Sequence, residues 1–355
     1  MTPSLFQPFT VRGVEFRNRL WIAPMCQYEA DAGRVGAWHV QWLGSLAAGG
    51  AGLVIAEATG VVPEGRITTR CPGLWDEQTA EFWRPAVEAA HRFGAKVGIQ
   101  LAHAGRKASR ISDLDHREAS PEQGGWQIVG PSANAFEGYP VARALELEEV
   151  RALPAAFAAA ASRAVAVGFD VLELHAAHGY LLHQFLSPLI NERTDEYGGS
   201  LENRCRLLVE SAKAVRESVG ADAPLFVRIS ATDWADGGWD LEQSVQLSKW
   251  LAEAGVDLID VSTGGAVAHQ QVQPAPLYQV PFATEIRESA GIPTAAVGLI
   301  NDPSEADRVV AEGLADAVLV GRAAIRNPNH PWAVAEALGY ALPLPHQFER
   351  GRRVF

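Results

Sequence analysis

The segment Val171–Pro188 reads VLELHAAHGYLLHQFLSP and joins a buried strand to a polar turn. Residues 171–174 form an apolar run of the kind found in parallel strands that are covered on both faces. His175, His178 and Tyr180 follow directly. Two imidazoles and a phenol at one strand end either hold a metal or bind something else, and the rest of the chain has to decide between these readings.

The same apolar pattern recurs along the chain. Eight runs, most of them preceded by Gly, Pro or Asp, cover residues 19–25, 52–58, 96–102, 170–175, 225–230, 257–262, 294–298 and 316–321. Helical patterns lie between them, including 77–94, which Gly94 would close, and a helix for which Ser200 is the expected N-cap. Eight alternating units are the number that closes a (β/α)8 TIM barrel. A doubly wound open sheet is the alternative, but no G-x-G-x-x-G follows the first run.

Composition excludes several classes of function. The 355 residues are 48% hydrophobic and 20% charged, as in an ordinary soluble globular protein. A net charge of −12 argues against nucleic-acid and anionic-membrane partners, which need basic surfaces. The first ten residues have no signal-peptide pattern. Cys26, Cys71 and Cys205 are too far apart for a CxxC site, and their odd number excludes a complete disulfide framework, so we expect a cytoplasmic protein.

Two long connections follow predicted strands. Residues 103–145 have a mixed composition without a helical period, and residues 176–199 separate the fourth run from its helix. In a barrel both connections rise from the C-terminal face, where barrel enzymes carry their active sites. We therefore predict one domain over residues 1–355, with 103–145 as a lid inserted after the third strand.

Polar and small residues gather where the predicted strands end. They are Pro24, Met25 and Cys26, then Ala58, Gln100, His175, His178, Tyr180, Arg228, Gly298, Gly321 and Arg322. Two carboxylates, Glu57 and Glu173, lie inside strands, and alternation does not decide which way they point.

The histidine pair has three readings. One histidine is an ordinary hydrogen-bonded core residue, or both bind a metal, although the next acidic residue is only at Glu192. In the third reading the two rings donate hydrogen bonds to one oxygen and polarise a carbonyl or nitro group, and Tyr180 delivers a proton.

The last two strands suggest an anion site. Gly298 and Gly321 would let backbone N–H groups approach a phosphate, and Arg322 could bind it in bidentate fashion, unless the glycines only form tight turns. Arg228 either pairs with a barrel carboxylate or stabilises negative charge on a bound ring system that Gln100 also contacts.

Taken together, the motifs resemble the old yellow enzyme family of FMN-dependent ene-reductases, in particular the thermophilic-like bacterial group that includes xenobiotic reductases. The resemblance covers essentially the whole chain. Its motifs include RNRLWIAPMCQY, GIQLAHAGRKA, GFDVLELHAAHGYLLHQFLSP, NERTDEYGGSLENR and VLVGRA. The expected fold is then a TIM barrel with an N-terminal hairpin and the lid after strand 3.

The resemblance implies a role for each residue at the strand ends. The residues expected to bind FMN are Pro24, Met25, Cys26, Ala58, Gln100, His175, Arg228, Gly298, Gly321 and Arg322. His175 and His178 would bind the oxygen of an activated alkene, Tyr28 would contact the substrate, and Tyr180 would be the proton donor. Cys26 would tune the flavin without acting as a nucleophile. No metal is expected.

The implied reaction is ping-pong. NAD(P)H passes a hydride to FMN N5 and leaves, and the alkene then accepts it at its β-carbon while Tyr180 protonates the α-carbon. Three alternatives are a related class with an iron–sulfur cluster, a non-redox barrel acting on a phosphorylated substrate, and a non-catalytic flavin-binding protein. The chain lacks clustered cysteines, and within the predicted strands its one lysine is Lys96, at the start of a strand.

The C-terminal tail, residues 340–355, shows no helical or strand period. In the thermophilic-like group a similar tail ending in YERG carries an arginine into a neighbouring subunit's active site. Here FERG places Arg350 at that position, although the chain continues with RRVF. The resemblance therefore implies a homodimer or homotetramer in which Arg350 contributes to substrate binding.

Overall fold

The computed structural model describes residues 2–112 and 117–352. Eight parallel strands form a closed barrel, in the order in which they occur along the chain. They are β3 (Leu20–Ile22), β4 (Leu53–Gly60), β5 (Lys96–Ala102), β8 (Val171–Ala176), β9 (Leu225–Ser230), β10 (Leu258–Ser262), β11 (Thr294–Ala296) and β12 (Ala317–Val320). Every one of the eight apolar runs overlaps a barrel strand, so the TIM-barrel prediction is confirmed.

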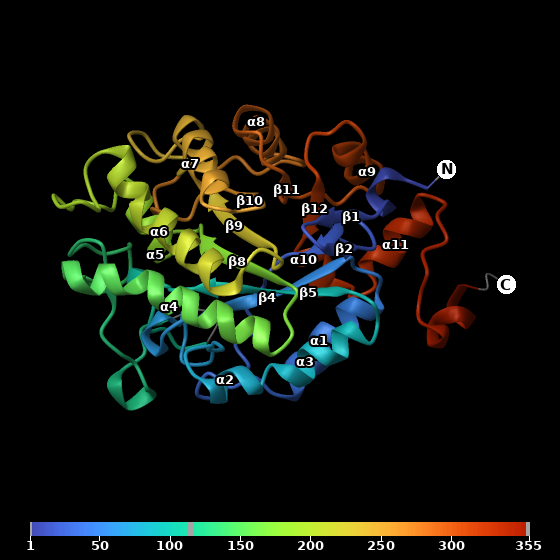
Figure 1. Ribbon diagram of the computed structural model, residues 1–355, viewed down its shortest axis with the longest axis horizontal. Helices are drawn as coiled ribbons and strands as arrows, with labels where there is room; N and C mark the ends of the chain where they lie inside the picture. Colours follow the sequence, from blue (N-terminus) through green and yellow to red (C-terminus); the bar gives the residue numbers. More distant parts are fainter. Residues whose placement is uncertain (1, 113–116, 353–355) are drawn as a thin grey trace.

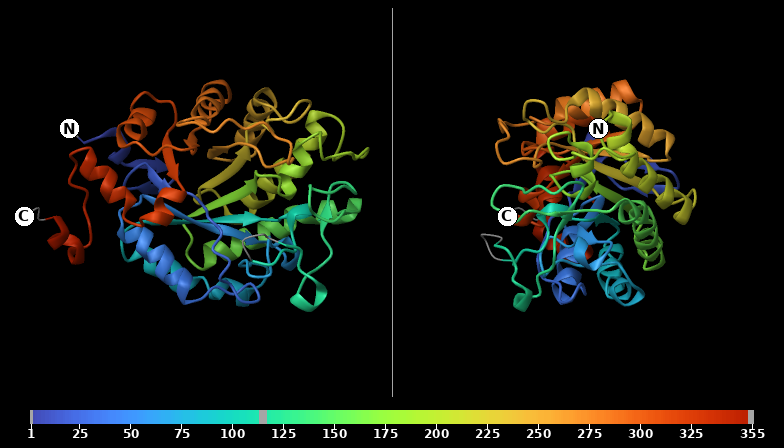
Figure 2. Two further views of the ribbon diagram at one scale, coloured as in Figure 1. Left: turned by 180° about the vertical axis from the view of Figure 1, so that it is seen from behind. Right: turned by 90° about the vertical axis from the view of Figure 1, so that its left-hand side faces the viewer.

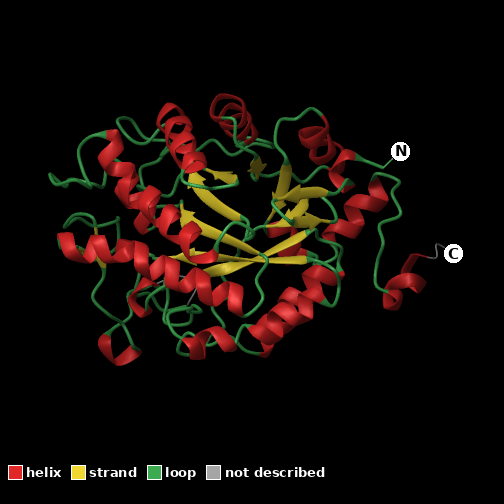
Figure 3. Cartoon of the chain, viewed as in Figure 1, coloured by secondary structure: helices red, strands yellow, loops and turns green. Residues whose placement is uncertain are grey.

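Helices surround the strands (Figure 1, Figure 3). They are α1 (Ala37–Ala48), α2 (Glu77–Glu81), α3 (Arg84–His91), α4 (Leu147–Ala166), α5 (Leu181–Leu186), α6 (Leu201–Val219), α7 (Leu241–Glu253), α8 (Val280–Ala290), α9 (Pro303–Ala311), α10 (Arg322–Arg326) and α11 (His330–Ala337). Ser200 caps α6 as predicted, because its side chain accepts a hydrogen bond from the backbone N–H of Asn203. Within the described residues, no helix is long and apolar enough to cross a membrane.

The prediction of one helix over residues 77–94 is wrong. The segment is divided into α2 and α3, and Pro85 lies in the first turn of α3. Proline has no backbone N–H and its ring clashes with the carbonyl four residues earlier, so it favours the first turn of a new helix over the interior of a long one. Gly94 does end the segment, with a φ of +76°.

A hairpin formed by β1 (Phe9–Val11) and β2 (Val14–Phe16) confirms the expected N-terminal hairpin. Its Phe16 belongs to the same buried cluster as Trp21 and Phe226, two residues of the barrel interior. The rings of Trp21 and Phe226 stack with their centres 5.8 Å apart, and Phe16 lies 4.9 Å from Trp21. Aromatic and aliphatic side chains therefore fill the N-terminal half of the barrel, and polar chemistry is confined to the other half.

The segment 103–145 contains only short elements among its described residues. They are the 3-10 helices η3 (Gly105–Lys107) and η4 (Pro121–Gln123) and the paired strands β6 (Val129–Gly130) and β7 (Arg143–Ala144). The segment lies at one end of the molecule, beyond the carboxyl ends of the strands, whereas the C-terminus lies at the opposite end (Figure 1, Figure 2).

The prediction that the tail has no regular structure is wrong for part of it. A 3-10 helix, η5, covers His346–Arg352, and two more 3-10 turns, η1 (Ser4–Phe6) and η2 (Pro63–Gly65), lie near the N-terminus and after β4. The Phe348 ring stacks on Trp332 of α11 at 5.9 Å, which anchors η5 to the body of the protein. Residues 353–355 lie outside the described range.

Candidate active site

The turn after β8 carries three of the predicted site residues. His178 and Gly179 both have left-handed backbones, with φ of +58° and +71°. At Gly179 a Cβ atom would lie 2.1 Å from the carbonyl oxygen of Gly265, so only glycine fits this turn. The backbone N–H of His178 donates to Ser230 Oγ at 2.9 Å, which ties the turn to the end of β9. Close packing against the neighbouring loop thus holds His178 in a strained conformation.

His175, His178 and Tyr180 form one aromatic group. The ring centre of His175 lies 5.3 Å from that of His178 and 5.0 Å from that of Tyr180. His178 Nε2 lies 2.8 Å from Ser262 Oγ. His175 Nδ1 is buried and has no hydrogen-bond partner within residues 2–112 and 117–352, so a ligand atom at this nitrogen would offset a desolvation cost.

Burial fixes the protonation of this group. Burial, followed by the positive charge of Arg228, lowers the pKa values of His175 and His178 well below the ordinary 6.5. Burial also raises the pKa of the Tyr180 phenol well above 10. At neutral pH the three side chains are therefore two neutral imidazoles, each with one N–H, and one protonated hydroxyl.

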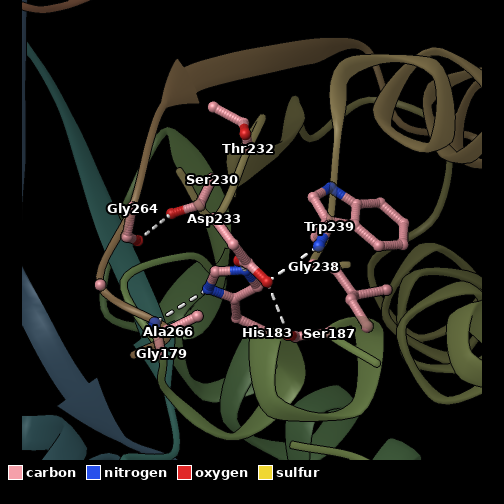
Figure 4. A network of polar contacts seen from close by, with 12 residues as sticks. Gly179, His183, Ser187, Ser230, Thr232, Asp233, Gly238, Trp239, Gly264 and Ala266 are labelled. Atoms are coloured by element: carbon pink, nitrogen blue, oxygen red, sulfur yellow. Dashed lines mark hydrogen bonds and ion pairs between the residues drawn. The ribbon is translucent and has the colours of Figure 1, made fainter. Parts of the chain in front are cut away.

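A second, fully buried network supports the turn from behind (Figure 4). The backbone N–H of Gly179 donates to His183 Nδ1 at 2.9 Å, so His183 Nε2 carries the proton that faces Asp233 Oδ1, also at 2.9 Å. Asp233 accepts further hydrogen bonds from Ser187 Oγ at 2.6 Å and from the backbone N–H of Trp239 at 2.9 Å. The network joins α5 to the loop after β9 and orients the segment between His178 and His183.

The opposite side of the site is formed by the loop after β3. Ala58 lies in one buried cluster with Cys71, against which Cys26, Tyr28 and Tyr180 pack. A hydrogen bond with the Cys71 thiol, together with burial, raises the pKa of Cys26 well above its usual value. Cys26 is thus a protonated thiol at neutral pH and a poor nucleophile. Pro24 is half-buried in the same loop, and Met25 lies beside Gly321.

The strand ends β9 to β12 enclose a cavity of about 400 Å³. Its lining includes Arg228, Gly298, Gly321 and Arg322, which the family resemblance assigns to the binding of FMN. Gly298 has a φ of +125°, and a Cβ atom there would lie 2.9 Å from Gln279 Nε2. Arg228 Nε is buried without a hydrogen-bond partner in the described part of the chain. An elongated ligand with an anionic end fits this donor set.

The structure settles the direction of two strand carboxylates. A bulge between Ala56 and Ala58 shifts the alternation of β4, so Glu57 faces α1, where it meets His39 at 3.2 Å and the backbone N–H of Gln27. Glu173 points into the barrel, where it accepts a hydrogen bond from Gln100 Nε2 at 2.8 Å. The alternative reading of Arg228 as an ion-pair partner is also observed, because its Nε lies 3.4 Å from Asp260 Oδ2.

Lys107 was missed in the sequence. Its Nζ donates to the backbone carbonyls of His178 at 2.8 Å and Gly265 at 3.2 Å, and it lies 5.2 Å from the centre of the Tyr180 ring. Burial and the neighbouring Arg106 lower its pKa to about 8. The adjacent cations Arg106 and Lys107 in an otherwise apolar strand end were the one signal that could have indicated a buried positive charge here.

Not all predicted residues come together. Arg350 is exposed on η5, at the end of the molecule opposite the segment 103–145 (Figure 2). It therefore cannot contact the site of its own chain. For the metal reading, the described residues contain no group of three or more His, Cys, Asp or Glu side chains suited to hold an ion.

Residues 4–339 match the NADH:flavin oxidoreductase / NADH oxidase family, which is described as FMN-linked. The chain belongs to this family. It is 45% identical to an NADPH dehydrogenase of Geobacillus thermodenitrificans and 43% identical to one of Bacillus subtilis, in both cases over 99% of this chain and all of the relative.

Solved structures place it among old yellow enzymes. Morphinone reductase in complex with tetrahydroNAD is 29% identical with a TM-score of 0.79, covering 97% of this chain and 93% of that one. The old yellow enzyme homologue from Zymomonas mobilis is 30% identical with a TM-score of 0.79, covering 97% and 94%. A 2-naphthoyl-CoA reductase complex gives a TM-score of 0.87 at 27% identity, but this chain spans only 53% of it. The protein is therefore an oxidoreductase that uses FMN and NAD(P)H.

We predict that Asp233→Asn destabilises the fold by about 2 kcal/mol at neutral pH, since a hydrogen bond to a buried charge contributes about 1.5–3 kcal/mol. Burial opposes the charge of Asp233, but the hydrogen bonds from His183 and Ser187 outweigh it and lower its pKa below the ordinary 3.8. A carboxyl pKa that is lower in the folded state stabilises the protein above the unfolded value, and this contribution is lost as pH falls through the folded value.

Urea unfolding at several pH values checks this prediction. The difference between the wild type and Asp233→Asn should be constant near neutral pH and shrink in acid. The matched control is Asp236→Asn, which changes an exposed carboxylate three positions away and should leave the unfolding midpoint unchanged. Equal effects of the two substitutions would contradict the role given to the network.

Proposed function

We propose that the protein reduces the activated C=C bonds of α,β-unsaturated carbonyl or nitro compounds, with NAD(P)H as the electron donor, in a ping-pong reaction. One observation carries the proposal: two neutral imidazoles and one protonated phenol converge at the mouth of the barrel. Neutral N–H donors bind an oxygen that becomes negative without themselves losing a proton.

The binding of FMN is proposed along the ends of β9 to β12. Arg228 and Gln100 would face the N1/O2 end of its ring, while Gly298, Gly321 and Arg322 would hold the phosphate. Bound FMN would supply the two-electron chemistry, accepting a hydride from NAD(P)H and passing it to the alkene. Pro24, Met25, Cys26, Ala58 and His175 would complete the flavin pocket.

The chain's own residues then bind the alkene and supply the proton. His175 and His178 hold the carbonyl or nitro oxygen and stabilise the negative charge that grows on it. Tyr180 keeps its proton at neutral pH and can transfer it to the α-carbon. Tyr28 packs in the cluster that contains Ala58 and Tyr180, and would contact the bound substrate from the first loop.

The segment 103–145 is proposed as the lid of this site. Arg106 donates to the backbone carbonyl of Ala266 at 2.8 Å, and Lys107 reaches the carbonyl of His178. Contacts from the segment to two other strand-end loops would exclude water from the reacting atoms. We keep the cytoplasm as the predicted location.

The function is tested by spectroscopy without oxygen. NADPH should bleach the yellow protein, and cyclohexenone should then restore the oxidised spectrum, while the saturated ketone cyclohexanone should not. A reduced flavin that stays reduced with every enone, maleimide and nitroalkene offered would contradict the proposal. Equal recovery with cyclohexanone would show that the oxidant is not the C=C bond.

We predict that His175→Ala slows alkene reduction by about 10²–10³-fold, since this is the typical cost of removing one donor to a developing oxyanion. Reduction of the flavin by NADPH should be much less affected, because hydride arrival does not use the oxygen site. Stopped-flow measurements of the two half-reactions separate these effects. An unchanged alkene half-reaction would remove His175 from substrate binding.

Tyr180→Phe removes the hydroxyl and keeps the ring. We expect slower protonation of the product with full FMN content, and a loss of rate that is smaller for substrates that solvent can protonate. Turnover with several alkenes, together with the flavin absorbance per mole of protein, checks this prediction. Unchanged turnover with all of them would mean that Tyr180 is not the proton donor.

The tail is proposed to complete the site of a neighbouring subunit in a homodimer or homotetramer. In support, Arg350 is exposed and far from its own site, and an isologous dimer would let each subunit contribute to the other. We predict that deletion from Arg350 onward raises the KM for alkenes and leaves FMN bound. Arg350→Gln should reproduce the effect in the full-length chain.

Light scattering measures the oligomeric state that this prediction requires. Exposed Arg308, which lies on α9 outside the tail, offers a matched control, and Arg308→Gln should not change the KM for alkenes. A fully active monomer at micromolar concentration would contradict the role of the tail.

A further inference from the structure

Four buried polar side chains lie side by side on the inner face of the barrel, deeper than the histidine pair. Gln100, Glu173, Arg228 and Asp260 come from the neighbouring strands β5, β8, β9 and β10 (Figure 1). In the strand register Gln100 is opposite Glu173, and Arg228 is opposite Asp260. Glu173 and Asp260 are 0% and 1% exposed, so bulk water does not solvate their charges.

The hydrogen bonds of this cluster do not balance if both carboxyl groups are ionised. Glu173 Oε1 accepts from Gln100, but among the described residues Glu173 Oε2 and Asp260 Oδ1 have no donor, and Asp260 Oδ2 has only the ion-pair contact with Arg228. Glu173 and Asp260 lie on the strands to either side of β9, and each affects the pKa of the other. A single proton between them would provide the missing donor.

The charges lead to the same result. Two carboxylates and one guanidinium would leave an uncompensated negative charge in the barrel, which is costly to bury. Burial and the charge of Asp260 raise the pKa of Glu173 well above its ordinary range, and burial also raises that of Asp260. Because Asp260 Oδ2 lies 3.4 Å from Arg228 Nε, the negative charge stays on Asp260 and the proton lies mainly on Glu173.

We propose that Glu173 and Asp260 share one proton, and that the charge remaining on the pair offsets Arg228 and lowers the reduction potential of bound FMN. This inference rests on the proposed placement of the flavin with its N1/O2 end at Arg228. The reduced flavin is negative at that end, so an unopposed guanidinium would stabilise it more strongly. Glu173 and Asp260 act through Arg228 and are positioning residues.

Two variants of the holoenzyme separate the two charge states. Glu173→Gln replaces a protonated carboxyl group with a neutral amide of the same shape, so the midpoint potential should stay that of the wild type. The double variant Glu173→Gln/Asp260→Asn also removes the remaining negative charge. It should bind reduced FMN about tenfold or more tightly relative to oxidised FMN, which raises the midpoint potential by about 30 mV for a two-electron couple.

Asp170→Asn is the matched control. Asp170 precedes β8 at its other end and pairs with His91 and Lys96, so this variant removes one negative charge outside the barrel interior. It should leave the potential unchanged. A rise in Glu173→Gln as large as in the double variant would overturn the proposal, because both carboxyl groups would then be ionised in the wild type.

An unchanged potential in the double variant would also overturn it, and Arg228→Gln then locates the error. If Arg228→Gln alters the potential or the affinity for FMN, the flavin placement stands and only the role of the carboxyl pair fails. If it alters neither, the flavin placement fails as well.

Infrared spectroscopy of the wild type does not depend on the variants folding. One proton on the pair predicts a C=O stretching band of a buried carboxylic acid. Because the group is buried, this band should shift only slowly after transfer to D2O. Absence of any protonated carboxyl band at neutral pH would overturn the proposal on its own.

Discussion

A guanidinium that stays charged inside a closed parallel barrel is the constraint on which the polar half of this molecule depends. Arg228 is 6% exposed, and a lone buried charge of this kind is unstable in a folded protein. Asp260 supplies the opposite charge on the next strand. The same cation contributes to the lowered pKa values of His175 and His178, so it also keeps the imidazoles neutral. One charge thus connects the proposed flavin pocket to the histidine pair.

The N-terminal half of the barrel interior is apolar and contributes to stability, whereas the other half carries the polar residues of the candidate site. Along β8 the inward positions change from Val171 to Glu173 and then to His175, whereas Leu172 and Leu174 face the helices and join the large outer core. The hairpin residue Phe16 closes the apolar end. The tightly packed apolar half of the interior holds the strands rigidly. It thereby fixes the distances between the polar groups at the carboxyl ends of the strands.

The sequence predicted the barrel well for a physical reason. Strands covered on both faces are apolar on both faces, and the runs at 96–102 and 225–230 coincide with β5 and β9. The local failures have equally local causes, such as the proline that divides α2 from α3. Composition alone left three readings of the histidine pair open. Its proposed role came from the resemblance, and it stays a prediction. The family and the cofactor are confirmed by the comparisons. The contact of Lys107 with His178 could not be predicted, because the two residues lie 71 positions apart and only the fold brings them together.

The bulge in β4 interrupts the regular alternation of its side chains between the inner and outer faces of the barrel. Before it, Ile55 joins the interior cluster, and after it Ala58 is paired with Gln100 on the inner face. A strand with the same residues but without the bulge would pair Glu57 with Gln100 and exchange the faces of everything downstream. The carboxylate of Glu57 would then point into the barrel in place of the Ala58 methyl group. The one-residue bulge therefore keeps the Glu57 carboxylate out of the barrel interior. A sequence alignment that ignores the bulge would place the second half of β4 one residue out of register.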